Sequence, residues 1–150
     1  MPENYPRRGI RARISSVHLQ VRPKRLLREC LMSDQPVTIL CLAGYYKGTS
    51  FLTAAKALGA RVLLLTREKN AAEPWPRESI DELLLMPDLR KRPDIIHAVS
   101  YLMRGRRIDA IVPLDDYDVE TAATLREHLR LPGLGEPTAR YFRDKLAMRM

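Results

Sequence analysis

The feature that most constrains the fold is an alternation of short apolar runs with amphipathic segments, which begins at Val37. Short apolar and β-branched runs are typical of strands that are buried on both faces. The segments between them repeat apolar residues every three or four positions, as amphipathic helices do. We therefore predict strands at residues 37–43, 61–66, 82–86 and 109–114, and helices at residues 49–58, 94–105 and 118–129.

Capping residues mark the ends of these predicted helices. We expect Thr49 or Ser50 to cap the first helix, and Gly59 follows its last turn. Asp94 and Asp118 stand where the second and third helices begin. Such short polar side chains favour helix N-termini because they accept hydrogen bonds from backbone N–H groups that lack a partner.

Strands that alternate with helices indicate an α/β fold, with one parallel sheet of about four strands and helices on both faces, in a Rossmann-like arrangement. Right-handed crossovers favour the spatial order 3-2-1-4. The first and fourth strands then lie side by side, and ligands bind at such a switch point beyond the carboxyl ends of the strands. Two stretches are expected to meet there, AGYYKGT (43–49) and PLDDYD (113–118).

The first of these loops could bind an anion. Gly44 and Gly48 allow a tight turn and a close approach to a ligand, the next helix offers unpaired N–H groups, and Lys47 adds a positive charge. Tyr46 stands where a dinucleotide fingerprint needs glycine, and the Walker A order is absent. An ordinary strand-to-helix turn is therefore the alternative, and Glu68, after the second strand, is interpreted as a surface residue.

The second loop carries three acids. Asp118 is predicted to cap a helix, which leaves Asp115 and Asp116 to hold a substrate amine or hydroxyl, or to orient the loop backbone. Asp118→Ala is accordingly expected to destabilise the fold, and Asp115→Ala to have little effect on stability.

The residue types exclude several other classes of site. Cys30 and Cys41 do not have metal or redox spacing, and Cys41 is predicted to be a buried, inert thiol in a strand. The three histidines have no partners at metal-ligand spacing. No apolar run approaches the ~20 residues of a membrane span. No catalytic triad or paired glutamate is apparent, and Trp75, between two prolines, is expected to anchor a loop.

The positive charge belongs mainly to the N-terminal part of the chain. Residues 1–31 contain eight Arg and Lys residues but only Glu3 and Glu29 as acids, so they carry +6 of the net charge of +8. Residues 1–35 are therefore interpreted as an unstructured basic leader, with Met32 as the natural start. A targeting arm or a phosphate-binding arm is the alternative. This distribution argues against a nucleic-acid-binding body, because the body is nearly neutral.

The C-terminal third of the chain resembles the junction between domains in ATP-grasp enzymes, which are ATP-dependent carboxylate–amine or carboxylate–thiol ligases. The matching residues are Asp115 and Asp116 in the loop, Leu131-Pro132-Gly133 in the following turn, and Asp144-Lys145 with Met148 in a last helix that opens near Pro137. The resemblance covers about residues 36–150. It implies a Rossmann-like pre-ATP-grasp domain at 36–136 and a truncated start of the ATP-grasp domain at 137–150. An apolar stripe of Phe142, Leu146 and Met150 predicts that this helix is continuous to the end of the chain.

The resemblance also implies a function. ATP would phosphorylate a carboxylate with the help of Mg²⁺, and an amine or thiol nucleophile would then displace phosphate from the acyl phosphate. Lys145 matches a lysine that contacts ATP phosphates, whereas the family's metal ligands lie in a C-terminal lobe outside this sequence. The candidate substrate-binding residues are Gly44, Tyr45, Tyr46, Lys47, Gly48, Asp115, Asp116 and Tyr117.

Within this predicted site, Lys47 is expected to hold a substrate carboxylate and the aspartates a substrate amine. The enzyme is expected in the cytoplasm, and a homodimer is compatible with the resemblance. Two alternatives stay open: a small Rossmann-like domain that binds a nucleotide or metabolite by itself, and a nucleic-acid-binding protein with a basic arm.

Overall fold

A four-stranded parallel sheet is the centre of the structure, a computed structural model that describes residues 35–142 and 145–149. The predictions for the leader, Met32, Cys30, Asp144 and Met150 lie outside the described residues. The strands are β1 (Thr38–Ala43), β2 (Arg61–Arg67), β3 (Glu82–Met86) and β4 (Ala110–Pro113). The α-helices are α2 (Thr49–Ala57), α3 (Arg92–Leu102), α4 (Val119–Leu129) and α5 (Glu136–Arg140). Short 3₁₀ helices span Glu68–Asn70, Arg77–Ser79, Asp116–Asp118 and Ala147–Arg149.

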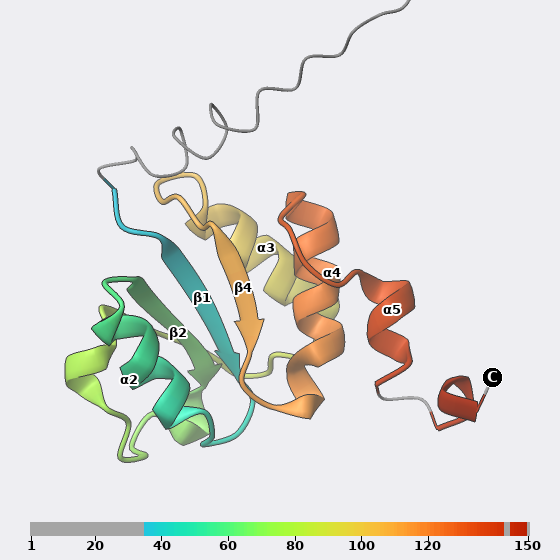
Figure 1. The fold of residues 1–150 in the computed structure, drawn as a ribbon, viewed down its shortest axis with the longest axis horizontal. Coiled ribbons are helices and arrows are strands. Elements are labelled where there is room, and N and C mark those ends of the chain that lie inside the picture. The colour runs from blue at the N-terminus through green and yellow to red at the C-terminus, as the bar shows by residue number, and fades with distance from the viewer. Residues whose placement is uncertain (1–34, 143–144, 150) are drawn as a thin grey trace, which may run out of the picture. The chain divides into compact units, whose positions relative to one another are not determined.

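The order of the strands is β3-β2-β1-β4, as the sequence predicted (Figure 1). β1 pairs in parallel with β2 on one side and with β4 on the other, and β3 pairs in parallel with β2. β1 and β4 are therefore neighbours although β2 and β3 lie between them in the sequence. The switch point that was expected between the first and fourth strands is present.

Helices cover both faces of the sheet, which confirms the predicted fold class (Figure 1). On one face, Leu52 and Ala55 of α2 pack with Cys41 and Val62 of the sheet. On the other face, α3 and α4 pack on the strand side chains that point to the opposite side of the sheet. The buried residues of this second core include Leu40, Leu42, Leu63, Ile95, Val99 and Leu125. The alternation of side chains along each strand thus supplies two separate cores.

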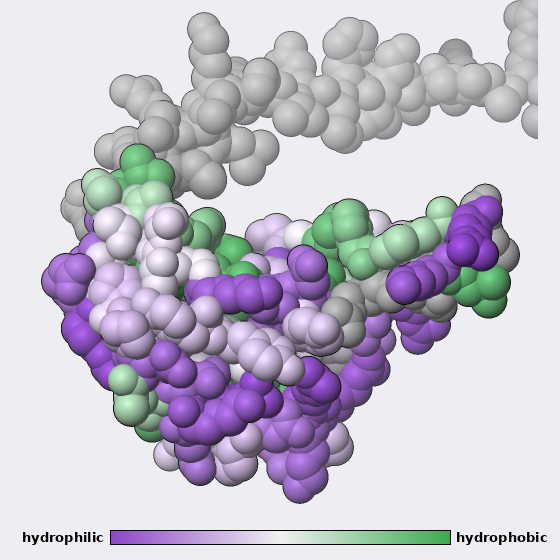
Figure 2. Space-filling model, turned by 90° about the horizontal axis from the view of Figure 1, so that it is seen from below, coloured by the Kyte–Doolittle hydropathy of each residue, from purple (hydrophilic) through white to green (hydrophobic). Residues whose placement is uncertain are grey.

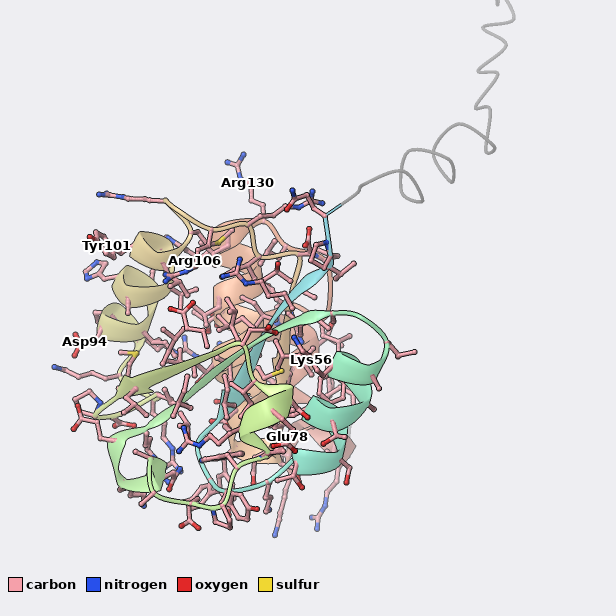
Figure 3. All side chains as sticks on the ribbon, turned by 90° about the vertical axis from the view of Figure 1, so that its left-hand side faces the viewer. Lys56, Glu78, Asp94, Tyr101, Arg106 and Arg130 are labelled. Atoms are coloured by element: carbon pink, nitrogen blue, oxygen red, sulfur yellow. The ribbon has the colours of Figure 1, made fainter. Side chains whose placement is uncertain are left out.

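Two carboxylates fix the amino ends of the inner strands. Thr38 N donates to Asp109 Oδ2 (2.9 Å), and Val62 N donates to Asp81 Oδ2 (2.8 Å). Asp81 also pairs with Lys56 of α2 (2.6 Å), and Lys56 is seen in Figure 3 beside the strands. Burial alone would raise the pKa of Asp81, but the hydrogen bonds from Lys56 and from Val62 N hold that pKa below its ordinary value.

The predicted N-terminal caps are wrong, whereas Gly59 follows the end of α2 as predicted, with a φ of 83°. The residue before α2 is Gly48, in the left-handed region, so that Thr49 and Ser50 do not cap it. α3 begins at Arg92 and includes Pro93 in its first turn, because proline is tolerated at the first helical positions. Asp94 consequently lies inside the first turn rather than at the cap.

The C-terminal segment does not form the continuous helix that its apolar spacing predicted. α5 has five residues and ends at Arg140, and Ala147–Arg149 is a separate 3₁₀ turn. Phe142 and Leu146 are 58% and 72% exposed. A helix this short is marginal by itself and needs a surface that buries its apolar stripe.

Candidate functional site

Two loops meet at the carboxyl ends of β1 and β4, as predicted. Gly44 N donates to Asp118 Oδ2 across 2.6 Å in a buried hydrogen bond. The carbonyl of Gly44 accepts from Arg67 Nε (2.6 Å) and from Asn70 Nδ2 (3.2 Å). Both backbone polar groups of Gly44 are therefore held by side chains of other segments. A Cβ at position 44 would lie 2.7 Å from Asp118 Oδ1, so any larger residue would force the Asp118 carboxylate to shift.

Asp118 ties the two loops together instead of capping α4, which corrects the prediction. It precedes α4, but its side chain accepts no hydrogen bond from that helix. Burial raises the pKa of Asp118 above its ordinary value, and the nearby Asp115 raises it further. The hydrogen bond from Gly44 and the charges of Arg67 and Arg90 oppose that increase without cancelling it.

Asp115 takes the local role that the sequence had given to Asp118. Its Oδ1 accepts from Tyr117 N (3.0 Å) and caps the 3₁₀ turn that leads into α4. Its buried Oδ2 lies 2.8 Å from Lys47 Nζ, and this hydrogen bond raises the pKa of Lys47. Lys47 and Asp115 are therefore each other's partners, and a substrate carboxylate or amine would compete with that ion pair.

The tyrosines of the first loop face different ways. The ring of Tyr46 packs edge-on against Trp75 (centroids 4.8 Å apart), and its hydroxyl donates to Pro74 O (3.0 Å). Trp75 is buried and donates from Nε1 to Asn70 O (2.8 Å), so it anchors its loop as predicted. Tyr46 belongs to that anchor.

Tyr45 and Tyr117 form an aromatic pair on the exposed side of the site. Their ring centroids lie 5.4 Å apart. The guanidinium carbon of Arg67 lies 4.6 Å from the Tyr45 centroid, and that of Arg90 lies 5.5 Å from the Tyr117 centroid. Both distances are typical of cation–π contacts. The surface over the strand ends is accordingly hydrophilic (Figure 2).

Gly48 makes the turn into α2 possible. Its φ of 77° lies in the left-handed region, and an added Cβ would meet Leu114 Cβ at 2.7 Å.

Two further candidates lie apart from these contacts. Asp116 is exposed in the second loop, next to Tyr117 in the sequence, and Lys145 is exposed in the segment that follows α5.

Three residues of the site were missed at the level of the sequence: Arg67, Asn70 and Arg90. Arg67 is the last residue of β2, and Asn70 closes the 3₁₀ turn after it. Since parallel strands end at one edge of the sheet, every strand end is a candidate position. That rule could have identified Arg67. Arg90 lies in the loop after β3, where the sequence offers only a run of basic residues.

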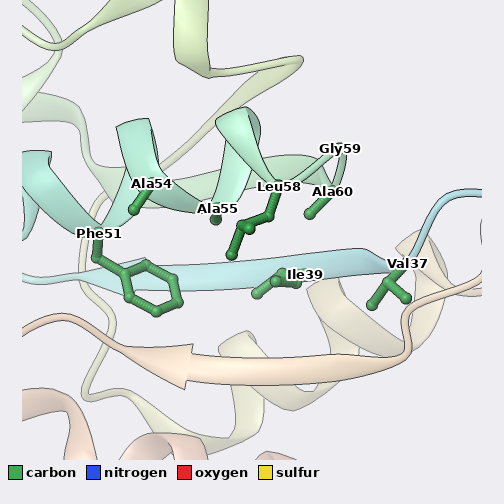
Figure 4. A pocket seen from close by; sticks show the side chains of 8 residues that line it. All are labelled: Val37, Ile39, Phe51, Ala54, Ala55, Leu58, Gly59 and Ala60. Atoms are coloured by element: carbon green, nitrogen blue, oxygen red, sulfur yellow. The ribbon is translucent and has the colours of Figure 1, made fainter.

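An apolar pocket of about 380 Å³ lies elsewhere, between α2 and β1 (Figure 4). Its lining is four larger apolar residues with alanines and a glycine, and none of the lining side chains is charged; the larger residues are Val37, Ile39, Phe51 and Leu58. The described part of the chain has no cluster of three His, Cys, Asp or Glu residues that could hold a metal. Within the same residues, every helix is too short or too polar to cross a bilayer.

Comparison with known proteins finds the same fold in solved structures. In the solved structures, the fold is similar to an L-amino acid ligase from Bacillus licheniformis (TM-score 0.65, 18% identity), and the match covers 78% of this chain and 28% of that one. It is also similar to phosphoribosylglycinamide synthetase from Anaerococcus prevotii (TM-score 0.63, 23% identity), with 77% and 28% covered. The chain thus spans little more than a quarter of either protein. No curated protein matches its sequence.

A family model matches a region that includes the second loop of the site but not the first. The model of the ATP-grasp N-terminal domain matches residues 52–133, which run from α2 through β4 and α4 to the Leu-Pro-Gly turn. This match covers more than half of the chain and includes the second loop and its acids. The chain therefore belongs to the ATP-grasp N-terminal domain family.

Proposed function

We propose that this chain is the substrate-binding segment of an ATP-dependent ligase that joins a carboxylate to an amine or a thiol. The observation that supports this most is the charged site at the β1/β4 switch point of an ATP-grasp N-terminal domain. The two similar structures are named as a ligase and a synthetase. Because the chain spans 28% of each, the activity of a whole ligase belongs to this proposal.

In the proposed reaction, ATP phosphorylates the substrate carboxylate and the nucleophile then displaces phosphate from the acyl phosphate. The contribution of this segment is to bind and orient the small-molecule substrates. The Gly44 loop is held rigidly by Asp118 and Arg67, so its backbone keeps a fixed position beside a ligand. A ligand that is already oriented loses less entropy on the way to the transition state.

Candidate contacts for the substrates differ in how accessible they are. Tyr45, Tyr117 and Asp116 are exposed, so they can contact a molecule that lies over the strand ends. The Lys47–Asp115 pair lies at the side of the same loops. Asp116 is the acid that can accept a hydrogen bond from a substrate amine without breaking a contact of the loop.

The nucleotide and the metal belong largely to other parts of the proposed enzyme. The described residues do not fit a magnesium centre, because they offer no cluster of metal ligands. Lys145 is exposed and is proposed to contact ATP phosphates, as a flexible ammonium group can do. No other described residue is assigned to ATP.

The test is to read the gene beyond codon 150 and to assay the protein that it encodes. We expect an open frame that adds nucleotide-binding lobes, and carboxylate-dependent formation of ADP. Hydroxylamine should trap the acyl phosphate as a hydroxamate. A stop at codon 151 together with absence of hydroxamate would contradict the proposal and favour a domain that binds a metabolite by itself.

A further inference from the structure

One buried cationic group at the site has an unsatisfied hydrogen-bond donor. Arg67 Nε donates to Gly44 O, but Arg67 Nη2 is buried and has no hydrogen-bond partner among the described residues. A buried donor without an acceptor is costly, and the few that occur in native proteins call for an explanation. An acceptor atom supplied by a ligand would explain this one.

Two further cations lie around the same pair of rings. Lys69 Nζ lies 5.6 Å from the Tyr45 centroid, and Arg90 Nη2 lies 3.5 Å from the Tyr45 hydroxyl. Arg67, Lys69 and Arg90 come from the end of β2, the turn after it and the loop after β3. The sheet therefore brings together three positive charges from separate segments, and an anion between them would offset their mutual repulsion.

The acids beside this cluster have other partners. Asp118 accepts from Gly44 N, and Asp88 Oδ1 accepts from Arg90 N (3.0 Å). Both acids lie close to Arg67, Arg90 and Tyr45. The charges of Arg67 and Arg90 act on Asp118 and oppose the rise of its pKa, but among the described residues neither Asp88 nor Asp118 makes an ion pair with Arg67 within 4 Å.

We propose that Arg67, Lys69 and Arg90 form an anion subsite, with Tyr45 and Tyr117 as its walls, which holds a carboxylate or phosphate group of the substrate. Planar guanidinium groups that are fixed against rings bind such oxyanions in a defined orientation. This inference rests on the proposed function, because it names the substrate class of the same site. It assigns the anionic group of the substrate to Arg67, Lys69 and Arg90, and leaves Lys47 to its ion pair with Asp115.

The experiment measures anion binding directly and without ATP. The full chain is titrated with sodium phosphate and, separately, with sodium acetate at constant ionic strength, while NMR signals of the Tyr45 and Tyr117 rings and of Arg67 Nε are followed. We expect saturable shifts of these signals. Saturation by phosphate alone identifies a phosphorylated substrate, and saturation by acetate identifies a carboxylate.

Variants locate the binding. Lys69→Gln and Arg90→Gln each remove one positive charge. Neither side chain donates a hydrogen bond to the backbone of the described residues, so the fold should survive. Each is expected to weaken binding about fivefold, as for exposed charge pairs, and the double variant more strongly. The matched control is Arg104→Gln, because Arg104 also lies over a tyrosine ring, that of Tyr101 (5.8 Å), on α3 (Figure 3).

The outcomes separate this inference from the proposed function. Shifts that stay linear with both anions, or binding that survives the double variant, would overturn the anion subsite. If hydroxamate trapping succeeds in that case, the ligase function stands and only the subsite is lost. If saturable binding is found but trapping fails, the subsite stands without the ligase function.

Discussion

Asp118 joins two loops that are 74 residues apart in the sequence through one carboxylate oxygen. The sequence placed this residue at the start of α4, where spacing alone predicts a cap. Spacing cannot show that Gly44 N lies closer to the carboxylate than the N–H groups of the helix, because that depends on how β1 and β4 pair. The neighbouring Asp115 takes the local hydrogen bond instead.

The stability of the site should depend on the acceptor at position 118. Asp118→Ala leaves Gly44 N buried without a partner and is expected to lower the free energy of unfolding by about 1–3 kcal/mol. Asp118→Asn keeps an acceptor oxygen and should lose less. Urea unfolding measures both, with Asp116→Ala as the control in an exposed acid. Equal decreases in the free energy of unfolding for all three variants would show that the hydrogen bond to Gly44 does not stabilise the fold.

The raised pKa of Asp118 gives that contact a pH dependence with a definite sign. Because the folded pKa lies above the unfolded value, near 3.8, the folded state binds more protons between the two values. The contribution of Asp118 to stability is therefore greatest below pH 3.8 and falls as the pH rises through the folded pKa. The difference in unfolding free energy between the wild type and Asp118→Asn should decrease over that window. A difference that increases with pH would contradict the assignment.

At the scale of elements, apolar periodicity predicted every strand of the described sheet and its three long helices. It failed for the segment after Arg140. An apolar stripe reports only that a helix could bury one face. The exposure of Phe142 and Leu146 shows that no described part of the chain provides the matching surface. The predicted start of α2 was right, but its cap was not, because Gly48 takes the cap position in the left-handed conformation. The predicted start of α3 was two residues late, because Pro93 is tolerated in the first turn.

Two glycines with the same left-handed backbone conformation allow the cost of backbone strain to be measured apart from the cost of a steric clash. Gly48 and Gly59 have φ values of 77° and 83°, but only Gly48 has a close neighbour for an added Cβ. Gly59→Ala should cost about 1 kcal/mol, from the left-handed backbone alone. Gly48→Ala should cost about 1–3 kcal/mol more, because Leu114 must move. Thermal unfolding of the two variants checks this, and equal losses would mean that Leu114 shifts freely.

The Leu-Pro-Gly turn is attached to the edge of the sheet by one arginine. Arg126 donates from Nε and Nη2 to Ile111 O (3.0 and 2.6 Å) and from Nη1 to Leu134 O (3.4 Å). Arg126→Met leaves the carbonyl of Ile111 without these donors and should destabilise the fold by about 1.5–3 kcal/mol.

Arg130→Met is the control for that change, at an exposed arginine just past the end of the same helix. It should alter stability by less than about 0.5 kcal/mol. Comparable losses in urea unfolding for Arg126→Met and Arg130→Met would refute the role of Arg126 at the sheet edge.

At the scale of the whole molecule, the strand order was predictable because right-handed crossovers leave few arrangements for four parallel strands. The position of the site followed from that order. The contents of the site were only partly predictable. Arg67 stands at a strand end and Arg90 in a run of basic residues, but neither pattern shows that these side chains meet Asn70 and the first loop, because only the assembled sheet brings them to the same edge.

Cys41 should report unfolding of the whole domain. The thiol is fully buried in β1, and burial raises its pKa to about 12. In a Cys30→Ser background, a thiol reagent at pH 8 should therefore label Cys41 only through global opening, and the rate should rise with urea in step with the unfolded fraction. Labelling in native buffer at the rate of the unfolded chain would contradict a closed core.

The double attachment of Gly44 bears on how molecules reach and leave this face. Its N–H and its C=O are both bonded to side chains that belong to other segments. A large movement of this loop over a bound molecule would have to break these hydrogen bonds. Association at this surface will therefore follow diffusion and charge, with rates that fall as salt rises. In the proposed ligase, the part that shields a reactive acyl phosphate from water must then be contributed by another region.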